Sequence, residues 1–133
     1  MELGKTPTVV KNDDPGLLDM AHNPALEMVC ISPGPGRPED AGLCLDFLRR
    51  LPPAVPVLGV CLGHQILGAF FGATVEVAKR IMHGKQSAAT HSGTGLFAGV
   101  PDGMRVARYH SLLVNPQGMD ASFSVTARTS DGE

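Results

Sequence analysis

The chain has 133 residues, enough for at most one domain with a real hydrophobic core, and we expect residues 1–133 to form one. Its 43% apolar and 18% charged residues are those of an ordinary globular protein, and no apolar run approaches the roughly 18 residues of a membrane span. A net charge of −2, with no basic stripe and one tyrosine, argues against a nucleic-acid partner.

The three cysteines, Cys30, Cys44 and Cys61, are odd in number, and none lies in a close pair or at metal-ligand spacing. A disulfide framework or a metal site is therefore not expected, and no motif calls for a cofactor. The N-terminus also lacks the charged-then-apolar pattern of a signal peptide. Together these features favour a reducing cytoplasm.

The first half of the chain predicts strands joined by a helix. Residues 6–10 predict a short strand, and a weak helix is expected at 16–22. The apolar run 27–32 is typical of a strand buried on both faces of a parallel sheet. A helix is expected over 38–51, followed by a strand at 55–60. This order predicts two parallel strands with a right-handed crossover, within an α/β fold that has an open, mostly parallel sheet and flanking helices.

The second half predicts one more helix and four strands. The helix follows Cys61 and ends near Phe71, where Gly72 stops it. Residues 82–85 are expected in a turn, and residues 110–112 at the end of a strand. The strands themselves are expected at 74–77, 86–91, 104–109 and 123–128.

A sharp turn is predicted around Cys61. A short apolar run ends in Gly59-x-Cys61-x-Gly63, and a helix-like apolar pattern follows at once. This is the layout of a nucleophile elbow, in which glycines remove Cβ atoms that would collide at a tight strand-turn-helix crossing. The positive end of the next helix favours the thiolate form of the cysteine. The alternative, a structural cysteine buried between a strand and a helix, stays open at this point.

A loop rich in proline and glycine, residues 33–38, follows the first buried strand. Because the carboxyl ends of neighbouring parallel strands lie at one edge of a sheet, we expect this loop close to Cys61. Backbone N–H groups of this loop, at Gly34 and Gly36, and of Leu62 are natural donors to the oxyanion that forms when a thiolate attacks a carbonyl. A stiff connector with no part in the chemistry is the other interpretation of the loop.

Four motifs follow one another along the chain: SPGPG at 32–36, GVCLGHQ at 59–65, MHGK at 82–85 and RYHSL at 108–112. Together they resemble the class I, or triad-type, glutamine amidotransferases. The resemblance covers nearly the whole chain, and the first two motifs are diagnostic of the wider family. The last two resemble the branch that serves chorismate, which holds the glutaminase subunits of anthranilate synthase and aminodeoxychorismate synthase.

The resemblance implies that Cys61 attacks the side-chain amide of L-glutamine, giving a γ-glutamyl thioester and releasing ammonia. It implies that the partner receiving the ammonia is a chorismate-binding synthase subunit, in anthranilate and hence tryptophan synthesis. Aminodeoxychorismate synthesis, which leads to folate, is the alternative. The residues implied to bind glutamine or shape its oxyanion hole are Gly34, Pro35, Gly36, Leu62, Gln65, Ser111 and Leu112.

The chain departs from the family pattern at both ends. It has no His-x-Glu motif, which in the family supplies the general base and its orienting glutamate, and no Asp-x-Tyr-Asp-Ser-Phe type segment. We therefore expect a chain truncated at both ends, with the nucleophile but not its base, and little turnover alone. A non-catalytic partner-binding module is the alternative for the chain as written. A cysteine hydrolase or isomerase of the related α/β group is a third interpretation.

Overall fold

The computed structural model describes residues 4–132. The chain divides into two compact units, one ending at Phe70 and one beginning at Phe71. Each unit has its own small sheet. Among residues 4–132 there is no helix with both the length and the apolar character needed to cross a membrane.

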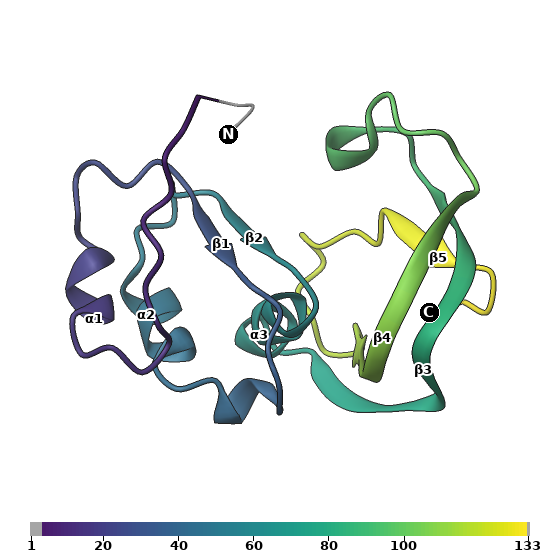
Figure 1. Cartoon of the computed structure of the whole chain (residues 1–133), viewed down its shortest axis with the longest axis horizontal. Helices are drawn as coiled ribbons and strands as arrows, with labels where there is room; N and C mark the ends of the chain where they lie inside the picture. The colour runs from purple at the N-terminus through teal and green to yellow at the C-terminus, as the bar shows by residue number, and fades with distance from the viewer. Residues whose placement is uncertain (1–3, 133) are drawn as a thin grey trace. The chain divides into compact units, whose positions relative to one another are not determined.

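The first unit contains a parallel pair of strands with helices packed against it (Figure 1). The strands pair with Val29 opposite Val57 and Ile31 opposite Gly59, which confirms the predicted strand-helix-strand unit and the α/β class. The elements are α1 (Leu17–Met20), β1 (Val29–Ile31), the 3-10 turn η1 (Pro38–Asp40), α2 (Cys44–Arg50), β2 (Val57–Gly59) and α3 (Leu62–Phe70).

The region between β1 and β2 differs from the single helix expected over 38–51, because η1 and α2 are separate. Gly42 separates them with a φ of +59°, in the left-handed region that favours glycine. A Cβ at Gly42 would lie 2.6 Å from the backbone oxygen of Asn12, and Leu43 donates its N–H to that same oxygen at 2.8 Å. The close approach of Asn12 thus accompanies the break in the helix.

The core of this unit lies where α2 and α3 meet the sheet. Its centre is Ile66, which is 1% exposed, packed with Ala41, Leu48 and Leu62. The apolar positions that predicted α2 and α3 supply these contacts, since residues three and four apart share one face of a helix. Partly buried side chains extend the cluster: Ile31, Cys44, Leu45, Leu51, Val57, Leu67 and Phe70.

Two expectations for the N-terminal half were wrong. Residues 6–10 form no strand, and Val9 is 89% exposed. Strand β1 is not buried on both faces, because Cys30 and Met28 just before it are exposed. In the part of the chain that the structure describes, β1 pairs with β2 alone, so residues 6–10 do not extend this sheet as a further strand.

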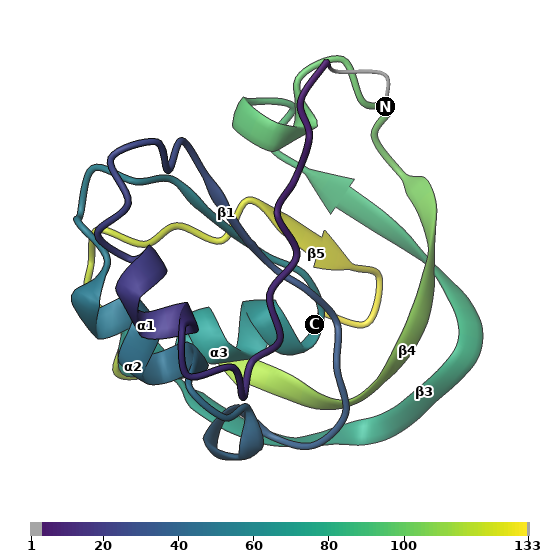
Figure 2. The ribbon, with the colours of Figure 1, turned by 60° about the vertical axis from the view of Figure 1, so that its left-hand side comes forward.

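The second unit is an antiparallel sheet in the order β4-β3-β5, dominated by the long ribbon of β3 and β4 (Figure 2). Thr74 lies opposite Asn115 at one end of the ribbon, and Ala89 opposite Met104 at the other. The short strand β5 pairs with the end of β3, with Ala89 opposite Thr129. The elements are β3 (Thr74–His91), the 3-10 turn η2 (Gly95–Phe97), β4 (Met104–Asn115) and β5 (Ala127–Thr129).

The turn expected at 82–85 was wrong, because these residues lie inside β3. Gly84 has a φ of +67°, and the register shifts between His83 and Lys85. A glycine in the left-handed region within a strand is typical of a β-bulge, so the residue that suggested a turn instead bends the ribbon. The strand expected at 123–128 is also shorter than predicted and begins at Ala127.

Replacing Ile66 with alanine should destabilise the first unit by about 2–5 kcal/mol, because the change leaves a cavity at the most buried side chain of the cluster. Denaturant unfolding followed by circular dichroism measures the loss. Val9→Ala, at an exposed position of the same unit, is the matched control and should change the midpoint little. Equal effects of the two changes would contradict the position of the core.

Candidate active site

Cys61 lies in the turn between β2 and α3, at the strand-turn-helix that its motif predicts. Its φ is +54°, and within residues 4–132 it is the one residue other than glycine in the left-handed region. Holding a non-glycine residue there costs about 1–3 kcal/mol, and such strain is concentrated at functional sites. The residue is exposed, so its thiol can meet a ligand from solvent.

The two glycines around Cys61 allow the backbones to touch. A Cβ at Gly59 would lie 2.5 Å from the backbone of Gly63, and one at Gly63 would overlap the carbonyl oxygen of Ile31. The N–H of Val60 donates to that carbonyl at 3.0 Å. A side chain at Gly59 would therefore push α3 away from β2, and a side chain at Gly63 would push it away from β1.

The proline-glycine loop approaches the same turn. A Cβ at Gly34 would lie 2.9 Å from Cδ2 of Leu62, and Gly36 has a φ of +82° that favours glycine. Leu62 is the first residue of α3, where a backbone N–H has no acceptor within its own helix. Loop and helix start thus lie in contact on the first unit, as an oxyanion hole built from both would require.

A cavity of about 480 Å³ lies along β1 in the same unit. Gly34, Pro35 and Leu62 line part of it, together with residues of β1 and of the segment 8–12. Cys61 does not line it. The cavity therefore reaches the loop and the helix start but does not contain the thiol.

Gln65 lies on α3 one turn beyond Cys61 and donates its backbone N–H to the Cys61 carbonyl at 3.1 Å. Its side chain is mostly buried, with the residue 7% exposed. We find no hydrogen bond to its amide group within residues 4–132, and no fully enclosed side-chain polar atom there lacks a partner. The amide of Gln65 thus keeps some contact with solvent and is available to a ligand.

The other titratable groups near the turn are not arranged as a base for Cys61. In the described part of the chain, no histidine makes a hydrogen bond to its sulfur. His64 is exposed by surface area, and partial desolvation of its ring lowers its pKa. Burial raises the pKa of the Cys44 thiol, which disfavours its reactive thiolate form.

Ser111 and Leu112 lie in the second unit, inside β4 rather than at the end of a strand as expected. The pairing of β4 with β3 is interrupted beside them. Leu112 is opposite Val77 and His110 is opposite Met82, so residues 78–81 face Ser111 alone. The backbone of Ser111 therefore lies at a gap in the regular ladder.

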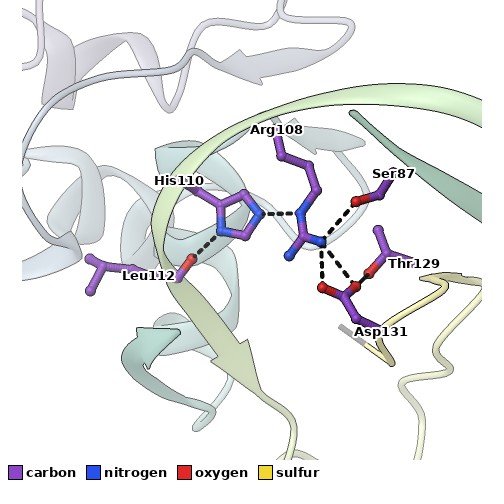
Figure 3. A network of polar contacts seen from close by, with 6 residues as sticks. All are labelled: Ser87, Arg108, His110, Leu112, Thr129 and Asp131. Carbon is purple, nitrogen blue, oxygen red and sulfur yellow. Dashed lines mark hydrogen bonds and ion pairs between the residues drawn. The ribbon is translucent and has the colours of Figure 1, made fainter. Parts of the chain in front are cut away.

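A polar network next to this gap was not predicted from the sequence. Arg108 is 4% exposed, and its Nη1 donates to both carboxylate oxygens of Asp131 at 2.9 and 2.8 Å and to Oγ of Ser87 at 3.1 Å (Figure 3). Its Nε donates to Nε2 of His110 at 3.1 Å. The alternation of β4 could have indicated that Arg108 is buried, because Arg108 occupies an inward position after Met104 and Val106.

Comparison with known proteins identifies the family. The family model described as glutamine amidotransferase class-I matches residues 1–133. This chain belongs to the class-I glutamine amidotransferases. The resemblance inferred from the four motifs is thereby confirmed.

Relatives of this class-I glutamine amidotransferase include components named for two different synthases. Aminodeoxychorismate synthase component 2 of Escherichia coli is 46% identical over 95% of this chain and 67% of its own length. Anthranilate synthase component 2 of Mycobacterium tuberculosis is 44% identical over 98% of this chain and 57% of its own. Among the curated relatives compared, the chain spans between 21% and 70% of their length.

A solved structure supports the fold. It is that of a protein described as a GMP synthase component, from Thermoplasma acidophilum, and the match covers 97% of this chain and 63% of the other with a TM-score of 0.79. At 22% sequence identity the likeness shows the shared α/β fold.

Gly63→Ala should destabilise the chain by about 1–3 kcal/mol or more, because the added methyl overlaps the backbone of Ile31 and has no flexible neighbour to displace. The midpoint of denaturant unfolding measures it. The matched control is His64→Ala, at the next and exposed position of the same helix, which should stay within about 0.5 kcal/mol of the unchanged chain. A tolerated Gly63→Ala would contradict the close crossing.

Acidification should weaken the ion pair between Arg108 and Asp131 in a pH range set by the pKa of Asp131. The hydroxyl of Thr129 and then the guanidinium of Arg108 lower the pKa of Asp131 from its ordinary 3.8 to about 2. The carboxylate therefore contributes its full stabilisation above about pH 4 and loses it as the pH falls through 2. Asp131→Asn should lower the unfolding midpoint at pH 7, and the gap from the unchanged chain should close between pH 4 and 2.

Asp13→Asn, an exposed position of the first unit, should leave the midpoint unchanged across the same pH series. A gap at Asp131 that persisted undiminished at pH 2 would show that the ionised carboxylate is not the source of its effect.

Proposed function

We propose that this chain is the glutamine-hydrolysing component of a chorismate-using synthase, with Cys61 as the nucleophile. The observation that carries the proposal is the backbone at Cys61. A φ of +54° places an exposed thiol on a sharp turn between two glycines that cannot accept a side chain. Membership of the glutamine amidotransferase family supports glutamine as the substrate.

The chemistry follows from the turn and the loop. The Cys61 thiolate attacks the side-chain amide carbon of glutamine, and the amide oxygen becomes an oxyanion. Backbone N–H groups of Leu62, Gly34 and Gly36 stabilise that charge, and the contact of Gly34 with the Leu62 side chain supports this arrangement. The carbon–nitrogen bond then breaks, and the departing nitrogen takes up the proton lost by the thiol and leaves as ammonia. Water hydrolyses the remaining γ-glutamyl thioester to glutamate and restores the thiol.

We infer further roles from the family resemblance. Gly34, Pro35, Gly36 and Gln65 contact the bound glutamine, which suits their place beside Leu62 and on α3. Ser111 and Leu112 hold its amino-acid end, and the interrupted ladder at Ser111 suits that role because it leaves backbone groups for a ligand. Residues 1–133 act within one glutamine amidotransferase domain, and we expect it in the cytoplasm.

The ammonia passes to a chorismate-binding synthase subunit in a hetero-oligomer. Relatives named for anthranilate synthase and for aminodeoxychorismate synthase support both products, and we favour the anthranilate branch with aminodeoxychorismate as the alternative. One Bacillus subtilis relative carries both names in one component, which supports a chain that serves either synthase.

A partner-binding module without glutaminase activity is a second candidate. It is favoured by the absence, within residues 4–132, of any histidine hydrogen-bonded to the Cys61 sulfur. Removing the base from a nucleophile–base pair reduces turnover by orders of magnitude. We therefore propose that this chain alone is alkylated at Cys61 more readily than it turns glutamine over.

The test is labelling with a glutamine analogue that carries an electrophilic diazo ketone in place of the amide. It should attach to Cys61, and excess L-glutamine should slow the attachment. Peptide mass spectrometry distinguishes this thiol from Cys30, which is also exposed. Cys61→Ser should abolish the label and Cys30→Ser should retain it, whereas equal labelling of both thiols would contradict a glutamine site at Cys61.

Ammonia release from L-glutamine is measured beside the labelling. Labelling with slow or no release supports a correctly built nucleophile without its base. Absence of labelling, together with capture of a chorismate-binding synthase subunit, would favour the binding module.

A further inference from the structure

The carbonyl of Leu112 is held by a side chain rather than by the strand ladder alone. Nδ1 of His110 lies 3.0 Å from that carbonyl oxygen (Figure 3). Residues 110 and 112 flank Ser111 at the gap in the pairing. The peptide that follows Leu112, one residue beyond Ser111, is therefore fixed from within its own strand.

Geometry determines which nitrogen of His110 carries the proton. A guanidinium can only donate, so the bond from Nε of Arg108 makes Nε2 of His110 an acceptor. The proton of the neutral ring must then be on Nδ1, where it is donated to the Leu112 carbonyl. Arg108 thus sets both the tautomer and the orientation of the ring.

Asp131 anchors the other end of this chain of hydrogen bonds. Its two oxygens accept from Nη1 of Arg108, and one of them also accepts from the hydroxyl of Thr129 at 2.6 Å. Asp131 lies in the turn after β5, which a bond of 2.8 Å from the Gly132 N–H to the Thr129 carbonyl closes. Bonds to a buried, paired charge are stronger than neutral ones and preserve the geometry of what they hold.

We propose that Arg108 and Asp131 are positioning residues that act through His110 on the peptide joining Leu112 and Leu113, next to Ser111, and so set the subsite for the amino-acid end of glutamine. The assignment rests on the proposed function, because glutamine is the ligand whose binding it explains. None of the three side chains needs to touch the ligand. Their contribution is to keep the backbone groups at the ladder gap in one orientation before the ligand arrives, which reduces the ordering that binding must impose.

Two substitutions of His110 separate positioning from general support of the fold. The amide nitrogen of asparagine can occupy the place of Nδ1 and still donate to Leu112, whereas the amide of glutamine reaches the place of Nε2 and cannot. His110→Asn should therefore retain affinity for L-glutamine within about twofold, and His110→Gln should lose about tenfold. If His110 only filled space, the two variants would have the same affinity for L-glutamine.

The readout is the L-glutamine concentration that halves the rate of Cys61 alkylation by iodoacetamide, a reagent that does not need the glutamine site. Peptide mass spectrometry follows Cys61 alone, and the unfolding midpoint of each variant is recorded beside it. Arg105→Lys is the matched control, because Arg105 lies on the same strand and bonds to Gln86 at an exposed position.

Arg108→Lys tests the hydrogen bond from Arg108 to His110. Lysine keeps the positive charge for Asp131 but cannot also present the fixed second donor to His110. When Arg108→Lys is the only substitution, the L-glutamine concentration that halves the rate of Cys61 alkylation should rise about tenfold. In the His110→Asn background it should add no loss, because asparagine offers no acceptor at the Nε2 place. Equal losses in both backgrounds would overturn the proposal.

The outcomes also separate this assignment from the proposed function. If L-glutamine does not protect Cys61 in the unchanged chain, the proposed function fails and this assignment fails with it. If glutamine protects the unchanged chain and protects His110→Gln equally well, the proposed function stands and the positioning role is wrong.

Discussion

The first unit depends on the direct contact of two backbones where α3 crosses the sheet. Gly63 lies against the carbonyl of Ile31, and Gly59 lies against the start of the same helix. That contact fixes where α3 begins, and so fixes Cys61 in the preceding turn and Leu62 against Gly34. The core around Ile66 forms along the same helix. One steric constraint thus supports both the packing and the candidate chemistry.

Local geometry is where the sequence was most informative. Two glycines flanking a cysteine, after an apolar run, specify a strand-turn-helix because few other sequences avoid collisions there, and the structure has that turn. The parallel pairing of β1 and β2 was predictable for a similar reason, since a helix between two apolar runs leaves few other topologies.

The errors arose where the outcome depends on partners distant in the sequence. Residues 6–10 have the composition of a strand, but a strand also needs a neighbour to accept its hydrogen bonds. Gly84 suggested a turn by itself, and only its pairing with β4 makes it a bulge. Arg108 lies on the inward side of an alternating strand, and no local rule states that Asp131, 23 residues later, compensates its charge. The ligand-binding roles of Ser111 and Leu112 come from resemblance and stay predictions.

The left-handed backbone at Cys61 also bears on why the residue is a cysteine at all. Glycine would adopt a φ of +54° without strain, and asparagine with little, so for folding alone cysteine is a poor choice at this position. Its small side chain is exposed and adds nothing to the core. Conformational preference and packing both argue against cysteine here, which is consistent with the nucleophilic role that we propose for its thiol.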